Sequence, residues 1–139
     1  MAIDGEFRAG RHVVFLMHAH LVFVTKYQHP VFTDAHLTRM EEIMREVCGD
    51  FETDLEEFNG EANHVHLLVS FPPKVAVSKL VNSLKGVSSR LLRKEHEELR
   101  FAHWRDVRLW SGSYLAGSVG GAPISVVRQY IEQLARPAV

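Results

Sequence analysis

The chain has 139 residues, 46% hydrophobic and 24% charged, a composition that excludes an intrinsically disordered protein. The length predicts one compact domain over residues 1–139 and is too short for two ordinary ones. The formal net charge of −1 hides an asymmetry: residues 34–61 carry ten acids and two bases, and residues 62–139 carry eleven bases and five acids. One surface could therefore hold a polyanion, although two solvated faces of opposite sign would give the same count.

The first predicted element is a long strand over residues 12–27, which are rich in β-branched and aromatic types. A helix follows, which Thr33 or Asp34 is expected to cap and Gly49 to end. Its apolar positions are Leu37, Met40, Met44 and Val47. Their spacing is that of a helix which buries one face.

Two more strands are predicted with a short turn between them. Residues 51–58 alternate loosely between apolar and polar types, and residues 59–63 are turn-forming. Residues 64–71 predict the third strand, which Pro72 and Pro73 end.

A second long helix is predicted over residues 77–98. Its buried stripe is Leu80, Val81, Leu84, Val87 and Leu91. Its exposed basic side chains are Lys79, Lys85, Arg90, Arg93 and Lys94. Residues 109–119 predict a fourth strand, and a final helix over about residues 123–136 carries Tyr130, with Pro123 in its first turn. This order of elements predicts an α+β fold with helices packed on an antiparallel sheet.

The cysteine content and the N-terminus suggest a compartment. Cys48 is the only cysteine, so no intrachain disulfide can form, and we expect it to be a small buried hydrophobe. The first residues lack the basic start and apolar core of a signal peptide, and no apolar run reaches membrane-spanning length. We therefore expect a soluble cytoplasmic protein.

Two histidine pairs have the spacing of metal ligands. His64 and His66 lie two residues apart on a predicted strand, so both side chains face one side and can reach one ion. His18 and His20 have the same spacing on the first strand. Spacing alone does not choose between the pairs, and histidines at the surface or packed on a sheet are the alternative for both. A metallo-hydrolase of the H-x-H-x-D-H kind is disfavoured, because residues 67–69 are apolar.

The segments around the second pair resemble a known family. They are "VFVTKY", "NHVHLLVSFPP", "VSKLVNSLKGVSSRLLRKE", "LWSGSYLAGSVGG" and "RQYIEQ". Together they resemble the single-tyrosine HUH (histidine, bulky hydrophobe, histidine) transposases of small prokaryotic insertion sequences, the IS200-like transposases. The resemblance implies the ferredoxin-like or RRM-like HUH fold. It also matches the family's ligand pair to His64 and His66, so we expect changes at His18 or His20 to leave metal binding intact.

The resemblance implies DNA strand transfer by Tyr130, although the residues alone favour a tyrosine packed on an apolar face. The phenol would attack a phosphodiester of single-stranded DNA at hairpin-marked element ends, leaving a 5′-phosphotyrosine and a 3′-hydroxyl. A divalent ion, Mg²⁺ or Mn²⁺, held by His64 and His66 would polarise the phosphate. Solvated side chains are the alternative for the four residues that we consider candidates for DNA contacts, Lys26, Lys79, Lys85 and Arg90.

Two positions depart from the family's pattern. Leu134 stands where a glutamine, four residues after the tyrosine, usually supplies a third metal ligand. Gln133 is the candidate substitute, with an ordinary solvated helix residue as the alternative. Asn63 stands where an aspartate commonly precedes the first histidine. These changes leave a weakened or degenerate enzyme open. Two other functions remain as alternatives: a metal-dependent phosphodiesterase that uses water, and a non-catalytic binder of DNA hairpins, which Leu134 motivates.

The resemblance also implies a homodimer in which the tyrosine helix of one subunit completes the HUH site of the other. Gly120 and Gly121 before Pro123 would form a permissive hinge. The long first strand would invite association if it lay at an unpaired edge. The alternative is that the glycines make a tight turn and the strand lies inside a monomer's sheet.

Overall fold

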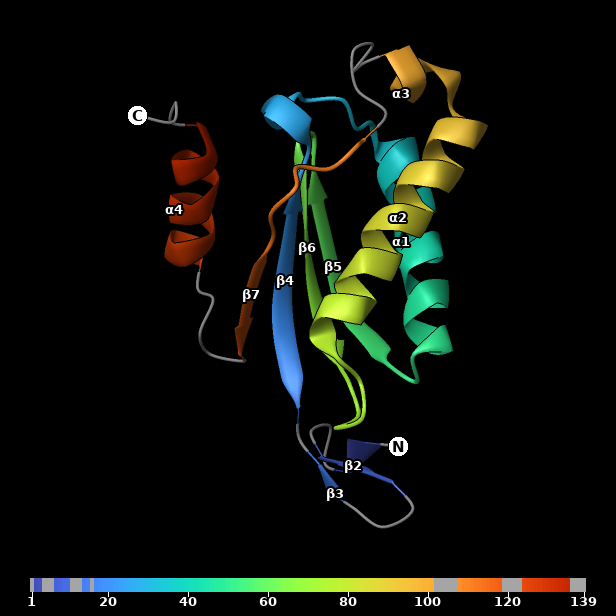
Figure 1. Cartoon of the computed structure of the whole chain (residues 1–139), viewed down its shortest axis with the longest axis vertical. Coiled ribbons are helices and arrows are strands. Elements are labelled where there is room, and N and C mark those ends of the chain that lie inside the picture. The colour runs from blue at the N-terminus through green and yellow to red at the C-terminus, as the bar shows by residue number, and fades with distance from the viewer. Residues whose placement is uncertain are drawn as a thin grey trace.

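A four-stranded antiparallel sheet forms the centre of the structure (Figure 1). The computed structural model describes residues 2–3, 7–10, 14–15, 17–101, 108–118 and 124–135. The strands are β4 (His18–Val24), β5 (Asp54–Glu61), β6 (His64–Ser70) and β7 (Leu115–Ser118), in the spatial order β5-β6-β4-β7. The prediction of an α+β fold with helices on an antiparallel sheet is confirmed.

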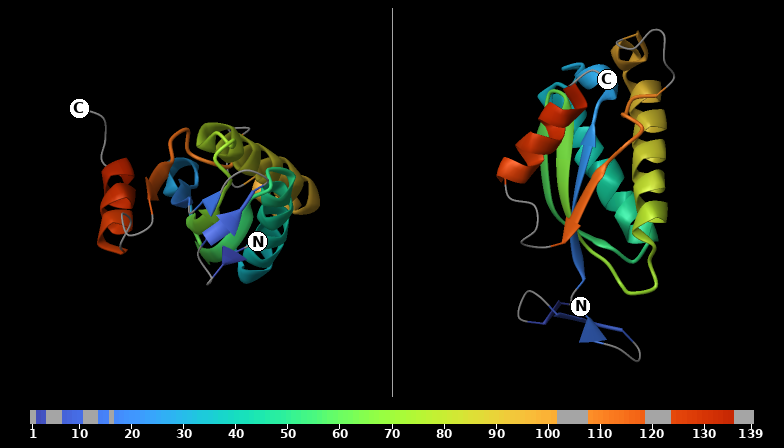
Figure 2. Two further views of the ribbon diagram at one scale, coloured as in Figure 1. Left: turned by 90° about the horizontal axis from the view of Figure 1, so that it is seen from below. Right: turned by 60° about the vertical axis from the view of Figure 1, so that its left-hand side comes forward.

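Helices cover both faces of this sheet (Figures 1 and 2). Helices α1 (Asp34–Asp50) and α2 (Val77–Glu95) pack on one face, and α4 (Ile124–Ala135) lies on the other. The short helix α3 (Glu97–Phe101) follows α2, and the 3₁₀ helix η1 (Lys26–Gln28) follows β4. A small sheet at one end contains β1 (Ala2–Ile3), β2 (Phe7–Ala9) and β3 (Val14–Phe15). None of the described helices is both long and apolar enough to cross a membrane.

The main core lies between the sheet and the layer of α1 and α2. Every second residue of β4 and β6 points into it, and these buried side chains are Ala19, Leu21, Phe23, Val65, Leu67 and Val69. The helices contribute the predicted stripes, including Met40, Met44, Val47, Leu80, Val81 and Leu84. Full burial of one such large side chain contributes about 1.5–3 kcal/mol. Cys48 is also buried here as predicted, and burial raises the pKa of its thiol to about 12.

The predicted strand over residues 12–27 is wrong in its limits and its place. Its first part belongs to the small sheet as β3, and β4 begins only at His18. Its last part is η1, where Tyr27 and Gln28 have φ angles of 58° and 55°, which no β-strand accommodates. Because β4 lies between β6 and β7, the interpretation of this strand as an unpaired edge is also wrong.

The hairpin of β5 and β6 is shifted from its predicted position. The C-cap of α1, Phe51, and the turn after it occupy residues 51–53, with Glu52 at a φ of 52°, so β5 starts later than the predicted strand over 51–58. Glu61 pairs with His64, which reduces the predicted turn over residues 59–63 to two residues. Strand β6 ends one residue short of the predicted limit.

The C-terminal helices and strand follow the predicted order, but their lengths differ from the prediction. The predicted helix over residues 77–98 divides at His96, whose extended backbone separates α2 from α3. The predicted strand over 109–119 shortens to β7, because Trp110 turns into the core and its indole donates to Ser88 Oγ at 3.0 Å. The final helix is close to its predicted limits, whereas residues 120–123 with the proposed hinge lie outside the described residues.

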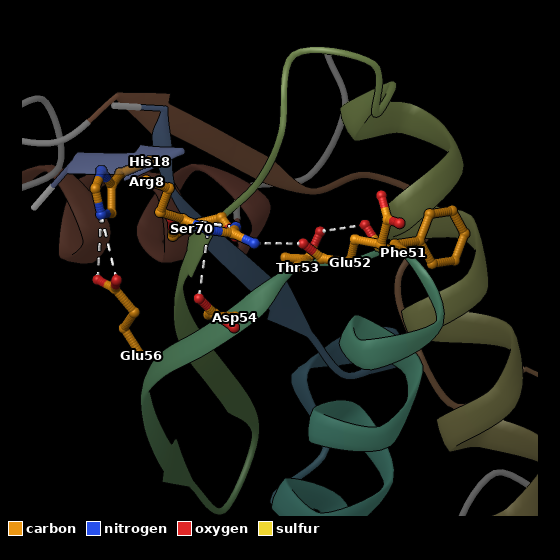
Figure 3. Close-up of polar contacts among 8 residues, drawn as sticks. All are labelled: Arg8, His18, Phe51, Glu52, Thr53, Asp54, Glu56 and Ser70. Atoms are coloured by element: carbon orange, nitrogen blue, oxygen red, sulfur yellow. Dashed lines mark hydrogen bonds and ion pairs between the residues drawn. The ribbon is translucent and has the colours of Figure 1, made fainter. Parts of the chain in front are cut away.

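Arg8 on β2 ties the small sheet to the main one (Figure 3). Its guanidinium donates to the backbone carbonyl of Ser70 at 2.7 Å and to that of Glu52 at 2.8 Å. Its Nε lies 3.5 Å from Asp54 Oδ2, and its guanidinium carbon lies 5.2 Å from the ring centroid of Phe15. One cation therefore joins β2, β3, β6 and the turn before β5.

We expect Arg8→Ala to lower the free energy of unfolding by about 1–3 kcal/mol, because two carbonyls lose a charged donor. Urea denaturation measures this change. Lys74→Ala is the matched control, since Lys74 pairs with the exposed side chain of Glu52 and such surface pairs contribute about 0–1 kcal/mol. Equal losses in the two variants would contradict the role given to Arg8.

Candidate functional site

His64 and His66 face the α4 side of the sheet from β6. Both are partly buried, and both line a pocket of about 800 Å³. Its lining also includes Asn63 and, from α4, Arg128 and Ile131. Alternation along β6 produces this arrangement, because Val65 and Leu67 point into the main core.

The protonation of the pair suits metal binding. His64 Nδ1 lies 2.9 Å from Asn63 Oδ1, an oxygen that only accepts, so Nδ1 carries the hydrogen and Nε2 keeps its lone pair. Burial lowers the pKa of both imidazoles, and neighbouring His20 lowers the pKa of His66 further. Neutral imidazole is the ligand form, and an acceptor behind a ligating histidine fixes its tautomer. Asn63 thus supplies the acceptor behind His64, and the residues present fit a divalent ion.

His20 on β4 lies beside this pair. Its Nδ1 is 2.8 Å from His66 Nε2, and the two ring centroids are 5.0 Å apart. In the register of β4 and β6, Val22 lies opposite His66 and His20 opposite Leu68, so the two histidines are diagonal neighbours on one face. The sequence predicted that His20 lies at the surface or packs on the sheet. This is correct, but the prediction did not include the contact of His20 with His66.

His18 lies apart from the site. Its Nε2 is 3.3 Å from Glu56 of β5 (Figure 3). The two H-x-H pairs face the same way, because both lie on paired strands at matching positions. Only the register decides which histidine of the first pair reaches the second pair.

Tyr130 lies on α4, where it packs against the sheet. Together with Ile131 and Leu134 it contacts the buried Val22 and Val24. Its hydroxyl lies 3.0 Å from Ser113 Oγ, in the segment before β7. Tyr130 is not among the described residues that line the histidine pocket. Within one chain, the predicted nucleophile therefore packs on the two valines paired with the predicted ligands, and its hydroxyl contacts Ser113.

Gln133, the candidate third ligand, and Leu134, at the family's usual ligand position, are also absent from that lining. Gln133 is exposed, and Leu134 packs on the apolar cluster with Val22 and Val24. Leu134 has no ligand atom, so Gln133 is the side chain of the two that could bind an ion.

A basic hollow lies on the opposite side of the sheet, between α2 and residues 108–112. It has a volume of about 690 Å³, and its basic lining residues are Lys85, Arg90, Arg93, Lys94, Arg100 and Arg108. The ammonium of Lys85 donates to the carbonyl of Ser111 at 2.7 Å, and burial lowers its pKa. Of the other predicted DNA contacts, Lys26 lies on η1, and Lys79 lines a separate pocket with Asp50 and Glu52.

Comparisons with known proteins identify the family. The family described as "Transposase IS200 like" matches residues 13–134. The chain belongs to the IS200-like transposases. The ISDra2 transposase TnpA of Deinococcus radiodurans is 28% identical over 127 residues, which are 91% of this chain and 90% of that protein. The transposase of insertion sequence IS200 from Salmonella typhimurium is 32% identical over 101 residues, which are 73% and 66% of the two chains.

Solved structures agree with this IS200-like fold. A candidate transposase from Deinococcus radiodurans R1 has a TM-score of 0.82 at 28% identity, over 94% of this chain and 99% of its own. A REP-associated tyrosine transposase, solved bound to a REP hairpin, has a TM-score of 0.56 at 8% identity, over 84% and 62%. The second likeness shows the fold alone. The family predicted from the motifs is confirmed.

A second group of potential ligands lies elsewhere in this IS200-like transposase. His36, His96 and Glu98 place ligand atoms within 4.8 Å of one another, a separation that could hold an ion. However, His36 Nδ1 accepts from the Thr33 backbone N–H at 3.0 Å, so its one hydrogen lies on Nε2 and is donated to Glu98 at 2.8 Å. An ion at Nε2 would have to remove that hydrogen while Nδ1 keeps its bond. The group therefore fits a structural tie between α1 and α3 better than a metal site.

Gln28 anchors the tyrosine helix of this transposase, which the sequence did not predict. Its side-chain amide donates to the Ile131 carbonyl at 2.8 Å. Both Gln28 and Tyr27 adopt the left-handed backbone region, which costs about 1–3 kcal/mol per residue. The strained turn of η1 is what aims the amide at α4.

We expect Gln28→Ala to increase amide exchange in α4 about 2- to 12-fold, which corresponds to one hydrogen bond of about 0.5–1.5 kcal/mol. Hydrogen exchange read by mass spectrometry measures the change. Gln129→Ala, at an exposed position on α4 itself, is the control and should have little effect. Unchanged exchange in Gln28→Ala would mean that the helix is held by its apolar contacts alone.

Proposed function

We propose that this transposase cleaves and rejoins single-stranded DNA at hairpin-marked element ends, through a 5′-phosphotyrosine on Tyr130. The observation that carries the proposal is that His64 and His66, whose pKa values are lowered by burial, face one pocket in a chain of this family. We place the reaction in the cytoplasm and take the ion to be Mg²⁺ or Mn²⁺. When bound, the ion would polarise the scissile phosphate and offset charge on the leaving oxygen.

In the proposed reaction the Tyr130 phenol loses its proton and its oxygen attacks phosphorus. The bond from phosphorus to the 3′-oxygen breaks, and that oxygen leaves as a hydroxyl. Attack by the 3′-hydroxyl of another strand then reverses the step on a new partner. One phosphodiester replaces another each time, so no nucleotide triphosphate is consumed.

The proposed partner is a DNA hairpin bound through basic side chains. The hollow beside α2 supports this, because it gathers Arg90 and Lys85 with other cations around a cavity. Arg90 is the better candidate of the two for a phosphate, since Lys85 already donates to a carbonyl. Lys26 and Lys79 remain proposed contacts outside this hollow. The structural relative solved with a REP hairpin supports the class of ligand by analogy of fold.

We further propose a homodimer with composite sites, in which one subunit's α4 delivers Tyr130 and Gln133 to the other's histidines. The position of Tyr130 supports this, because in its own chain the hydroxyl bonds to Ser113 and does not line the histidine pocket. Gln133 would then be the third ligand in place of the apolar Leu134.

Incubation with Mn²⁺ and labelled single-stranded element ends should give a covalent protein–DNA adduct on a denaturing gel. Tyr130→Phe should lower its yield by about 10³-fold or more, since the nucleophile is lost. Tyr27→Phe, at the exposed tyrosine of η1, is the control and should keep the adduct. His64→Ala and His66→Ala should lose cleavage but keep hairpin binding, which phosphate contacts dominate.

Two other outcomes identify the alternative functions. Cleaved DNA with no adduct, unchanged in Tyr130→Phe, would indicate a phosphodiesterase that uses water. Hairpin binding without any product would indicate a non-catalytic relative, which the apolar Leu134 makes a serious alternative.

Mixing Tyr130→Phe with His64→Ala subunits tests the composite site. A mixed dimer would hold one site with both parts intact if Tyr130 acts in trans, so cleavage should return to at most half of the wild-type yield per dimer. Each variant alone is the control. If mixed dimers form, as shown by tagged co-purification, and cleavage stays absent, Tyr130 does not act in trans.

A further inference from the structure

His20 and His66 form a hydrogen bond that lies along the line joining the centroids of their two rings. The two nitrogens are 2.8 Å apart and the ring centroids 5.0 Å apart. The distance between the centroids is close to the nitrogen–nitrogen distance plus the distance from each nitrogen to its own ring centroid. The two nitrogens therefore lie near the line that joins the centroids, and each points at the other. Two ligands of one ion would instead direct their lone pairs at a point beside this line.

The hydrogen bond limits which nitrogen of His66 can bind an ion. A neutral imidazole has one N–H and one lone pair. If His20 donated, His66 Nε2 would be occupied as an acceptor and its Nδ1 would carry the hydrogen, so no ligand atom would remain. If His66 donates through Nε2, its Nδ1 keeps a lone pair.

We propose that His20 is a positioning residue of the metal site, which accepts the hydrogen of His66 Nε2 and leaves His66 Nδ1 for the ion. The inference rests on the proposed function and adds to it the residue that orients the second ligand. In this arrangement His20 acts on His66 from the neighbouring strand as Asn63 acts on His64 from the adjacent position in the chain. Each ligating imidazole donates its hydrogen to a neighbouring acceptor and keeps one lone pair. From the sequence alone we expected His20→Ala to leave metal binding intact, and this contact reverses that expectation.

The neighbouring His18 provides a matched control. It lies on the same strand and the same face, but it bonds to Glu56 and not to the histidine pair. A general effect of losing an imidazole from β4 would appear in both variants, whereas an effect on His66 would appear only for His20.

The test is Mn²⁺ affinity of the DNA-free protein, measured by the electron paramagnetic resonance signal of free Mn²⁺. His20→Ala should weaken binding about 10- to 100-fold, the usual loss when the partner of a ligating histidine is removed. His20→Asn should recover most of the affinity, because its side-chain carbonyl can accept the same hydrogen. His18→Ala should bind as the wild type does, and His66→Ala should lose the site.

A second measurement needs no variant. Nitrogen-15 shifts of the wild-type rings should show His66 protonated at Nε2 and unprotonated at Nδ1 before any ion is added. His66 protonated at Nδ1 would overturn the proposal, as would Mn²⁺ affinity in a folded His20→Ala that equals or exceeds that of the wild type. Wild-type protein that binds no Mn²⁺, or that binds it equally after His66→Ala, would instead overturn the metal site of the proposed function, and this inference with it.

Discussion

The antiparallel pairing of β4 with β6 is the constraint on which the rest of the molecule depends. Seven residue pairs, from His18 with Ser70 to Val24 with His64, fix one register between the two strands. Because side chains alternate along a strand, a slip of one residue would turn His64 and His66 into the main core and expose Val65 and Leu67. The buried valines and leucines thus determine where the imidazoles point. Stability and chemistry are set by the same register.

The helices on the two faces of this sheet are attached by different kinds of contact. On one face, two long helices bury a continuous core with β4 and β6. On the other face, α4 has a small apolar contact at Val22 and Val24, together with the polar contacts from Gln28 and Ser113. Among the residues whose side chains are described, α4 thus contacts the sheet through a smaller apolar cluster than α1 and α2 do.

Local patterns predicted the parts of the molecule that local physics determines. The buried stripes of α1 and α2, the β-strand around His64 and the helix around Tyr130 all follow from residue spacing, and the motifs identified the family. The limits of β4 could not be predicted, because the strand ends where Tyr27 and Gln28 adopt left-handed angles. Its central place could not be predicted either, because β7 joins it from far along the chain.

The site illustrates the same division. The i, i+2 spacing on one strand made His64 and His66 visible in the sequence, whereas the contact with His20 depends on the register between two strands. The bond from Gln28 to α4 joins residues that are 103 positions apart. The sequence carried one signal for His20: two H-x-H pairs on strands that the fold places side by side.

The basic hollow is lined by α2, on one side of the sheet, and the histidine pocket by α4, on the other. A ligand that occupies both cannot be a straight duplex, because the sheet and its helices stand between the two sites. It must contain a flexible segment that passes around the protein, and unpaired nucleotides are flexible in this way. The thickness of the protein would then act as a ruler, setting how many unpaired nucleotides separate a bound stem from the phosphate presented to the histidines.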